Sequence, residues 1–298
     1  MIVVRCKGGL GNQCFQYAAG RALAARQAVP LRFDSRWFAR PEHQVTVTRT
    51  FDLPAFAVAC ETATDAELAP FAFEETRRLW PRLKARSVRL FTGRRVWSDG
   101  ELGYNPEFAA LGINVLLDGY FQHPAYFASV ENELRRELRL REAPPDTIVA
   151  KASELRAAQG VCIQVRRTDF VLDRARAQRH GVCSLDYFRA AWTLVRARAP
   201  NVRGFVFADD PAWAVEAFQG WPDVSVMTAD WNGPNFLHQF FLMQACRHFI
   251  IANSTWGWWA AWLGAQPNSV VVMPARWFAD PTVNATAMGL RLPHWHVC

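Results

Sequence analysis

The chain has 298 residues, of which 51% are hydrophobic and 20% are charged, and this composition excludes a disordered or fibrous protein. Its formal net charge of +7 favours an anionic partner, such as a nucleotide, a phospholipid surface or a nucleic acid. No apolar segment is long and uninterrupted enough to predict a transmembrane helix, so we expect a soluble or peripheral protein.

The seven cysteines are an odd number, and they form neither a CxxC pair nor a zinc-site spacing with histidines. Most of them stand in apolar strings, which is typical of reduced thiols in a protein core. We therefore expect a cytoplasmic protein with free cysteines.

A strand, a glycine-rich turn and a helix are predicted at the start of the chain. The apolar run Ile2–Cys6 is followed by the turn Gly8–Asn12, and apolar residues then recur at helical spacing from Phe15. Glycines between a strand and a helix let backbone N–H groups approach a phosphate or a sugar closely. A tight structural turn would use the same residues, so this pattern alone does not decide between the two interpretations.

The middle of the chain gives a weaker pattern. Residues 30–118 show few clear periods apart from a predicted strand at Val115–Leu117, and a helix is predicted at about 125–141. The segment 142–146 contains two prolines and is predicted to be a linker. We therefore expect two domains, residues 1–142 and residues 146–298.

The second half alternates strands and helices, which predicts a parallel sheet covered on both faces. Ligands of such sheets bind beyond the carboxyl ends of the strands, so chemistry is expected at the residues that follow each strand. The predicted strands are Val161–Val165, Gly204–Ala208, Val224–Met227, Phe249–Ala252 and Val270–Met273, with helices at about 186–199, 211–219, 235–247 and 256–264.

Two arginines follow the strand Val161–Val165 directly. Arg166 and Arg167 suit a diphosphate, because a guanidinium offers a planar fork of donors that keeps its charge. Asp169 is placed to orient one of them. The alternative is a structural Arg–Asp pair.

Polar residues also follow two other predicted strands. Asp209 and Asp210 follow Gly204–Ala208, and we expect one to contact a nucleobase or ribose while the other caps the next helix. The alternative is a capping role for both. Asn253, Ser254 and Thr255 precede a tryptophan-rich helix, where they can cap the helix or hold a phosphate. Since the chain contains no Asp-x-Asp pair to hold a divalent cation, we expect no metal and no other cofactor.

Together these strings resemble glycosyltransferase family 11, the α-1,2-fucosyltransferases. The resemblance rests on Gly8-Gly-Leu-Gly-Asn-Gln-Cys-Phe-Gln-Tyr-Ala, Gly119-Tyr-Phe-Gln, Val165-Arg-Arg-Thr-Asp, His180-Gly-Val-Cys-Ser-Leu-Asp-Tyr-Phe, Phe207-Ala-Asp-Asp and Ile250-Ile-Ala-Asn-Ser-Thr-Trp-Gly-Trp-Trp. It implies a GT-B-type α/β fold, with two Rossmann-like domains facing a central cleft. Residues 1–142 would form the acceptor side, and residues 146–298 would bind GDP-fucose. The implied reaction moves L-fucose from GDP-β-L-fucose, with inversion and without metal, to O-2 of a terminal galactose.

The resemblance also implies site residues. Arg166 would stabilise the leaving phosphate, with Asn12 and Asp169 completing the catalytic set. The implied substrate-binding residues are Gly9, Gly11, Gln13, Gln164, Arg167, Asp209, Asp210, Asn253, Ser254 and Thr255. The family's arginine motif begins with a histidine where this chain has Gln164, and it has a glycine where this chain has Thr168. These two departures keep open another linkage, such as α-1,6.

Three questions stay open at this point. The general base for the acceptor hydroxyl is not readable: Asp34, Asp169 and Asp173 are the candidates, and no carboxylate base is required if the departing phosphate takes the proton. A non-enzymatic nucleic-acid-binding module is a second functional class, motivated by the net charge. The basic segment Arg77–Arg95 has eight cations and no acidic residue, so either peripheral contact with an anionic membrane at the inner face of the cell membrane or an ordinary solvated surface would explain it.

Overall fold

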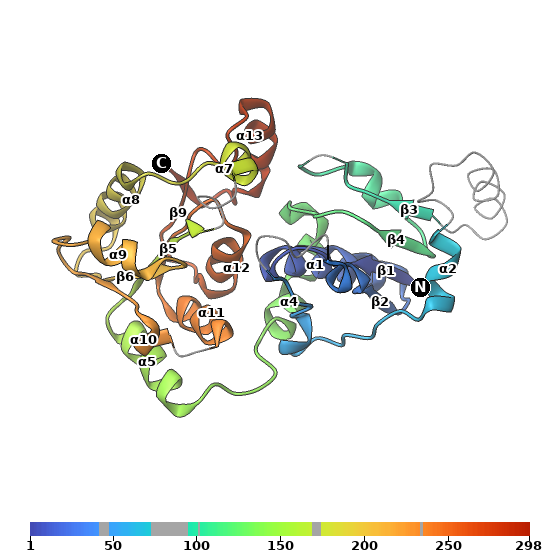
Figure 1. The fold of residues 1–298 in the computed structure, drawn as a ribbon, viewed down its shortest axis with the longest axis horizontal. Helices are drawn as coiled ribbons and strands as arrows, with labels where there is room; N and C mark the ends of the chain where they lie inside the picture. The colour runs from blue at the N-terminus through green and yellow to red at the C-terminus, as the bar shows by residue number, and fades with distance from the viewer. Residues whose placement is uncertain (42–47, 73–94, 101, 169–173, 233–234) are drawn as a thin grey trace. The chain divides into compact units, whose positions relative to one another are not determined.

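The computed structural model describes residues 1–41, 48–72, 95–100, 102–168, 174–232 and 235–298. The chain forms two compact units, Met1–Arg141 and Glu142–Cys298 (Figure 1). The division falls beside the segment 142–146 that the sequence predicts as a linker. Asp169, Asp173 and the basic segment up to residue 94 lie outside the described residues.

The first unit is built on a four-stranded parallel sheet in the order β2-β1-β4-β3. The strands are β1 (Ile2–Arg5), β2 (Leu31–Asp34), β3 (Arg95–Trp97) and β4 (Val115–Leu117). The helices are α1 (Leu10–Gln27), α2 (Asp65–Ala72) and α4 (Glu131–Glu137), with 3₁₀ turns at Arg36–Ala39, Leu53–Ala55, Pro106–Ala110, Pro124–Tyr126 and Ala128–Val130.

Helix α1 packs closely on this sheet because its side chains there are small. A Cβ at Gly20 would collide with Val4, and α1 carries a further run of buried alanines. Gly8 has a φ of +76°, a conformation that favours glycine, and it turns the chain from β1 into α1. The glycine-rich turn therefore has a structural reason of its own.

The second unit is built on a six-stranded sheet in the order β10-β9-β8-β5-β6-β7. Its strands are β5 (Val161–Val165), β6 (Gly204–Ala208), β7 (Val224–Val226), β8 (His248–Ile250), β9 (Val271–Met273) and β10 (His296–Val297). Its helices are α5 (Asp146–Ala157), α7 (Arg174–His180), α8 (Leu185–Arg198), α9 (Pro211–Ala217), α10 (Ala229–Asn232), α11 (Phe236–Ala245), α12 (Thr255–Gly264) and α13 (Pro281–Ala287), with a 3₁₀ turn at Met288–Leu290.

Helices cover both faces of this sheet, as the strand sequences require. In Figure 1, α8 and α9 lie on one side of β5 and β6, and α11 and α12 lie on the other. One buried cluster joins Val161, Ile163 and Val165 of β5 to residues of α8 and α9. Since side chains alternate along a strand, Gln164 of β5 points to the opposite face, toward α12.

The structure confirms the predicted α/β class and the strands Val115–Leu117, Val161–Val165 and Gly204–Ala208 at the expected bounds. The prediction of a single helix at about 125–141 is wrong. Two 3₁₀ turns occupy its first part, and Val130, with φ −129° and ψ 23°, interrupts helical geometry before α4 begins. None of the helices in the described part of the chain has the length and hydropathy of a membrane span.

Candidate functional site

The second unit has a topological switch point between β5 and β8. The chain passes from β5 to β6 and β7 on one side, and from β8 to β9 and β10 on the other. Ligands of open parallel sheets bind outside the carboxyl ends of the strands at such a point. Arg166 follows β5 and Ser254 lies just after β8, so the structure brings these two predicted residues to neighbouring strand ends.

Asp209 anchors the turn that carries the arginines. Its carboxylate lies 3.3 Å from Nε of Arg166, and both side chains are partly buried, at 18% and 24% exposure. The same carboxylate accepts the backbone N–H groups of Arg167 and Thr168 at 2.8 and 3.0 Å. The orienting carboxylate shown here is therefore Asp209, and its geometry gives it an anchoring role where base or ribose recognition was expected.

Arg167 and Asp210 are fixed by the neighbouring helix α9. The Arg167 guanidinium lies 4.2 Å from the centre of the Trp213 ring, a cation–π contact that sequence analysis missed. Asp210 accepts the Trp213 N–H at 3.1 Å and so caps α9. The capping half of the prediction for the two aspartates is therefore met by Asp210.

The amino end of α12 lies at the same edge of the sheet. Ser254 is its N-cap residue but its hydroxyl does not cap the helix, and Ser254 and Thr255 are both half-buried. The first N–H groups of a helix have no partner within it, and the helix dipole favours an anion there. A phosphate is the ligand that this arrangement suits.

Asn253 does not share this geometry. It is 3% exposed, and its amide donates to the carbonyls of His180, Gly181 and Trp277 while its Oδ1 accepts from the Cys183 thiol. These bonds tie the end of β8 to the segment after α7. The structure gives Asn253 an internal role in place of the expected substrate contact.

Gln164 is also internal, with 3% exposure. Its Oε1 accepts the Ala252 N–H at 3.2 Å, and its own main-chain oxygen shares that N–H at 3.1 Å. Its Nε2 donates to the Val165 carbonyl at 3.2 Å. Gln164 therefore joins the ends of β5 and β8, and the geometry does not support its interpretation as a donor-binding residue.

In the first unit, the carboxyl ends of the central strands β1 and β4 carry the glycine-rich turn and the Gly119–Gln122 string. Asn12 of the turn accepts a hydrogen bond from Gln122 Nε2 at 2.9 Å. Gly9 is the N-cap residue of α1, and Gly11 is buried. Two of the strings that supported the resemblance are therefore joined by the hydrogen bond between Gln122 and Asn12.

Gln13 lies inside the protein. Its side chain has no exposed surface, and it bonds to the carbonyls of Gly8 and Thr50 and to the N–H of Asp52. It thus holds the turn to the segment around Thr50, which is a structural role in place of the expected substrate contact.

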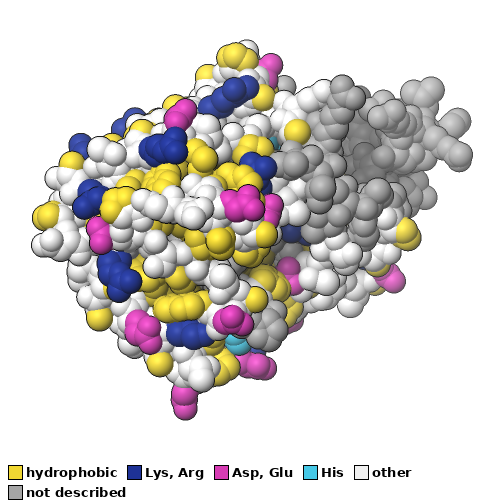
Figure 2. Space-filling model, turned by 60° about the vertical axis from the view of Figure 1, so that its left-hand side comes forward, with side chains coloured by type: hydrophobic (Ala, Val, Ile, Leu, Met, Phe, Trp, Pro, Cys, Tyr) yellow, Lys and Arg dark blue, Asp and Glu magenta, His cyan; other side chains and the backbone are white. Residues whose placement is uncertain are grey.

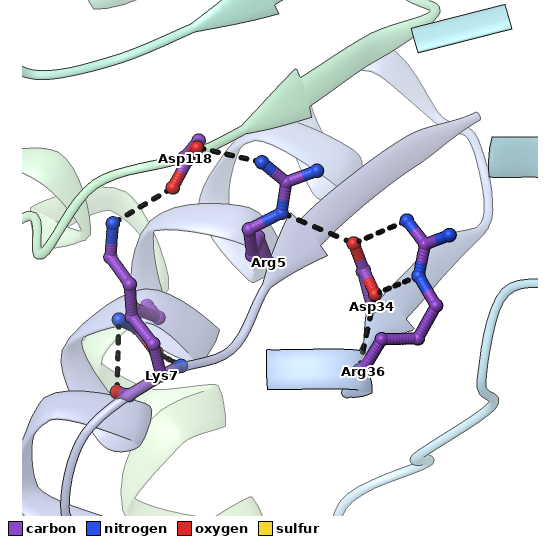
Figure 3. Close-up of polar contacts among 6 residues, drawn as sticks. Arg5, Lys7, Asp34, Arg36 and Asp118 are labelled. Carbon is purple, nitrogen blue, oxygen red and sulfur yellow. Dashed lines mark hydrogen bonds and ion pairs between the residues drawn. The ribbon is translucent and has the colours of Figure 1, made fainter. Parts of the chain in front are cut away.

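A chain of alternating charges crosses the same strand ends (Figure 3). Arg5 lies between Asp34 and Asp118, at 3.1 and 2.8 Å, and Lys7 and Arg36 complete the chain at its two ends. Burial tends to raise the pKa values of Asp34 and Asp118, but their hydrogen bonds and charge contacts with these cations outweigh it and hold both below their ordinary values. Asp34 is also only 2% exposed, so it is a poor candidate for the general base.

The family model for glycosyl transferase family 11 matches residues 104–297. The chain belongs to glycosyltransferase family 11. It is 26% identical over 294 residues to an α-1,2-colitosyltransferase of Escherichia coli, covering 96% of this chain and 95% of that protein. It is 27% identical to the O-antigen biosynthesis glycosyltransferase WbnK of Escherichia coli, covering 91% and 93%. A galactoside α-(1,2)-fucosyltransferase 1 of Saimiri sciureus is 24% identical, covering 86% of this chain and 63% of that protein.

Two solved structures are similar in fold. The α-1,6-fucosyltransferase NodZ, soaked with GDP-fucose, matches with a TM-score of 0.51 and 18% identity, over 88% of this chain and 92% of that one. FUT1 of Arabidopsis thaliana in complex with GDP matches with a TM-score of 0.51 and 14% identity, over 91% and 70%. These matches and the two parallel sheets confirm the predicted GT-B-type α/β fold.

Proposed function

We propose that this family 11 glycosyltransferase moves L-fucose from GDP-β-L-fucose, with inversion, to O-2 of a terminal galactose. The observation that carries the proposal is the meeting of Arg166 and the amino end of α12 at the β5–β8 switch point. Both groups favour a diphosphate there. We infer the α-1,2 linkage from the names of the relatives from Escherichia coli and Saimiri, which both state it.

The second unit would stabilise the leaving nucleotide. Breaking the sugar–phosphate bond places positive charge on the sugar and negative charge on the departing GDP. Arg166 and the N–H groups of the first α12 turn would meet that negative charge, and a preorganised donor of this kind is typically worth about 3–4 kcal/mol. Asp209 would keep the guanidinium in place. No step of this proposal uses a metal.

A second candidate is transfer of another glycosyl group. The relative with 26% identity is named a colitosyltransferase, so the donor pocket of this chain has to be tested with the colitosyl nucleotide as well. Another linkage, such as α-1,6, remains the alternative for the fucosyl reaction. Linkage analysis of the product from each donor with a panel of galactosides, lactose included, separates these possibilities.

The face shown in Figure 2 does not favour the non-enzymatic alternative. On the face shown in Figure 2, lysine and arginine side chains are scattered and are interrupted by carboxylates and hydrophobic groups. Nucleic-acid-binding surfaces gather their basic residues into a patch or a stripe. A calorimetric titration with GDP tests the donor site directly, and salt-sensitive DNA binding without GDP binding would refute the proposal.

A further inference from the structure

Three aspartates stand at the carboxyl ends of three strands of the first unit's sheet. Asp34 ends β2, Asp118 follows β4, and Asp99 lies two residues after β3. Because the strands are parallel, all three lie at the edge of the sheet where ligands bind. Of the three, only Asp34 is a candidate base on the sequence alone, because β3 falls in the part of the chain without a clear period.

Asp99 is held in place by the turn that follows β4. Its Oδ2 accepts the N–H of Phe121 at 2.6 Å. Phe121 has a φ of +52°, an unusual and strained conformation for a bulky residue, and its N–H group donates to Asp99 from this turn. A Cβ on Gly119 would collide with Asp99 Oδ1, and the glycine thus permits the carboxylate to approach.

Asp99 differs electrostatically from its two neighbours. Asp34 and Asp118 each pair with cations. Among the described residues Asp99 forms no ion pair. Burial raises the pKa of Asp99 above its ordinary value, and its backbone hydrogen bonds and the charge of Lys7 oppose that rise without cancelling it. A half-buried carboxylate of this kind accepts a proton more readily than a carboxylate between two cations.

The surroundings of Asp99 suit a sugar. Tyr120, on the adjoining turn, is 38% exposed, and Lys7 lies 5.1 Å from the centre of its ring. Lys7 and Asp118 are partly exposed, at 22% and 27%, and offer a donor and an acceptor for hydroxyl groups. Among the described ionisable groups, Lys7 lowers the pKa of Asp99 by its charge. Burial and the charge of Asp99 in turn raise the pKa of Tyr126.

We propose that Asp99 is the general base that takes the proton of the attacking acceptor hydroxyl. This inference rests on the proposed glycosyl transfer. The acceptor oxygen forms a bond to the anomeric carbon of the donor, and the bond from that carbon to the phosphate oxygen breaks, with its electron pair leaving on GDP. The hydroxyl proton moves to the Asp99 carboxylate and then to water, which restores the carboxylate.

The test compares wild type, Asp99→Asn and Asp118→Asn at saturating GDP-fucose over a range of pH. Asparagine keeps an oxygen for the Phe121 N–H but accepts no proton, so kcat should fall by about 100-fold or more in Asp99→Asn. The melting temperature and the GDP Kd should stay near wild type. In wild type, activity should fall as the pH drops through the raised pKa of Asp99, and this acid limb should vanish in Asp99→Asn but persist in Asp118→Asn.

Near-normal kcat in Asp99→Asn, or an acid limb that disappears in Asp118→Asn instead, would overturn the proposal. If Asp99→Asn unfolds, Asp99→Glu decides: a glutamate keeps a proton acceptor in a different position, so the acid limb should remain but move, and an unmoved limb counts against Asp99. Failure of wild type to transfer from GDP-fucose would refute the proposed function itself, before any variant is compared.

Discussion

Replacing Gly257 by alanine should place a side chain against Gln164, and the cost of this contact should offset or exceed the helix propensity that alanine adds. A Cβ at position 257 would lie 2.5 Å from Gln164 Oε1, 3.0 Å from its Cδ and 3.2 Å from its Cγ. The glutamine is 3% exposed and bonded on both sides, so it cannot move aside freely. We therefore expect Gly257→Ala to break the bond from Ala252 or to strain the first turn of α12.

The magnitude follows from two opposing effects. Overpacking of this kind costs about 1–3 kcal/mol, whereas replacing glycine by alanine inside a helix gains up to about 1 kcal/mol. Gly257→Ala should thus range from neutral to about 3 kcal/mol destabilising in wild type. In a Gln164→Ala background the clash is gone, and the same change should stabilise the protein by up to about 1 kcal/mol. The coupling energy between the two sites is then about 1–3 kcal/mol.

Differential scanning calorimetry of the full chain and of the three variants measures this cycle. For a unit of this size, 1 kcal/mol corresponds to roughly 2–4 °C in melting temperature. The expected signature is a change of sign: Gly257→Ala lowers or leaves the melting temperature in wild type and raises it beside Gln164→Ala. An equal shift in both backgrounds would show that Gln164 does not set the distance between α12 and the sheet.

Three further outcomes are expected. Arg166→Lys should lose most activity, because lysine keeps the charge but not the planar fork or the Nε contact with Asp209, and near-normal turnover would show that the fork is not needed. Transfer should continue in excess EDTA, and activity lost to EDTA but restored by Mn²⁺ or Mg²⁺ would contradict metal independence. The segment Arg77–Arg95 should bind anionic but not neutral liposomes at low salt, and equal binding to both would assign it to an ordinary surface.

Two strands of the second unit, β5 and β6, could be predicted at their observed bounds because each is a run of five residues that is apolar apart from Gln164. Val161–Val165 and Gly204–Ala208 are buried throughout, so their ends, and the arginines after them, are readable from the sequence. Whether a polar residue near these strand ends contacts a ligand or lies inside the protein could not be predicted from the sequence. Gln164 and Asn253 stand beside the same strand ends as Arg166, and only their packing distinguishes an internal amide from one that reaches a ligand.

The first unit was harder for a different reason. Strand β3 has three residues, too few for a period to emerge, and it lies after a long stretch of mixed composition, whereas the equally short β4 is wholly apolar and was predicted. Asp99 and Asp118 can be recognised as candidate site residues only from the parallel pairing of β3 and β4, which places them at one edge of the sheet. Asp34 could be identified as a candidate base, but the two arginines that weaken it as a base come from β1 and from the turn after β2.

The ion pair between Lys7 and Asp118 in the first unit affects the pKa of Asp99. Lys7 lowers the pKa of Asp99 by its charge, but its ammonium is 2.8 Å from Asp118, which partly neutralises that field. Asp118→Asn removes the neutralising charge, so Lys7 should act more strongly on Asp99 and lower its pKa further. Activity is present where Asp99 is ionised, and the acid limb of kcat should therefore move to lower pH in Asp118→Asn. A limb that moves to higher pH would mean that Lys7 does not act on the proton acceptor.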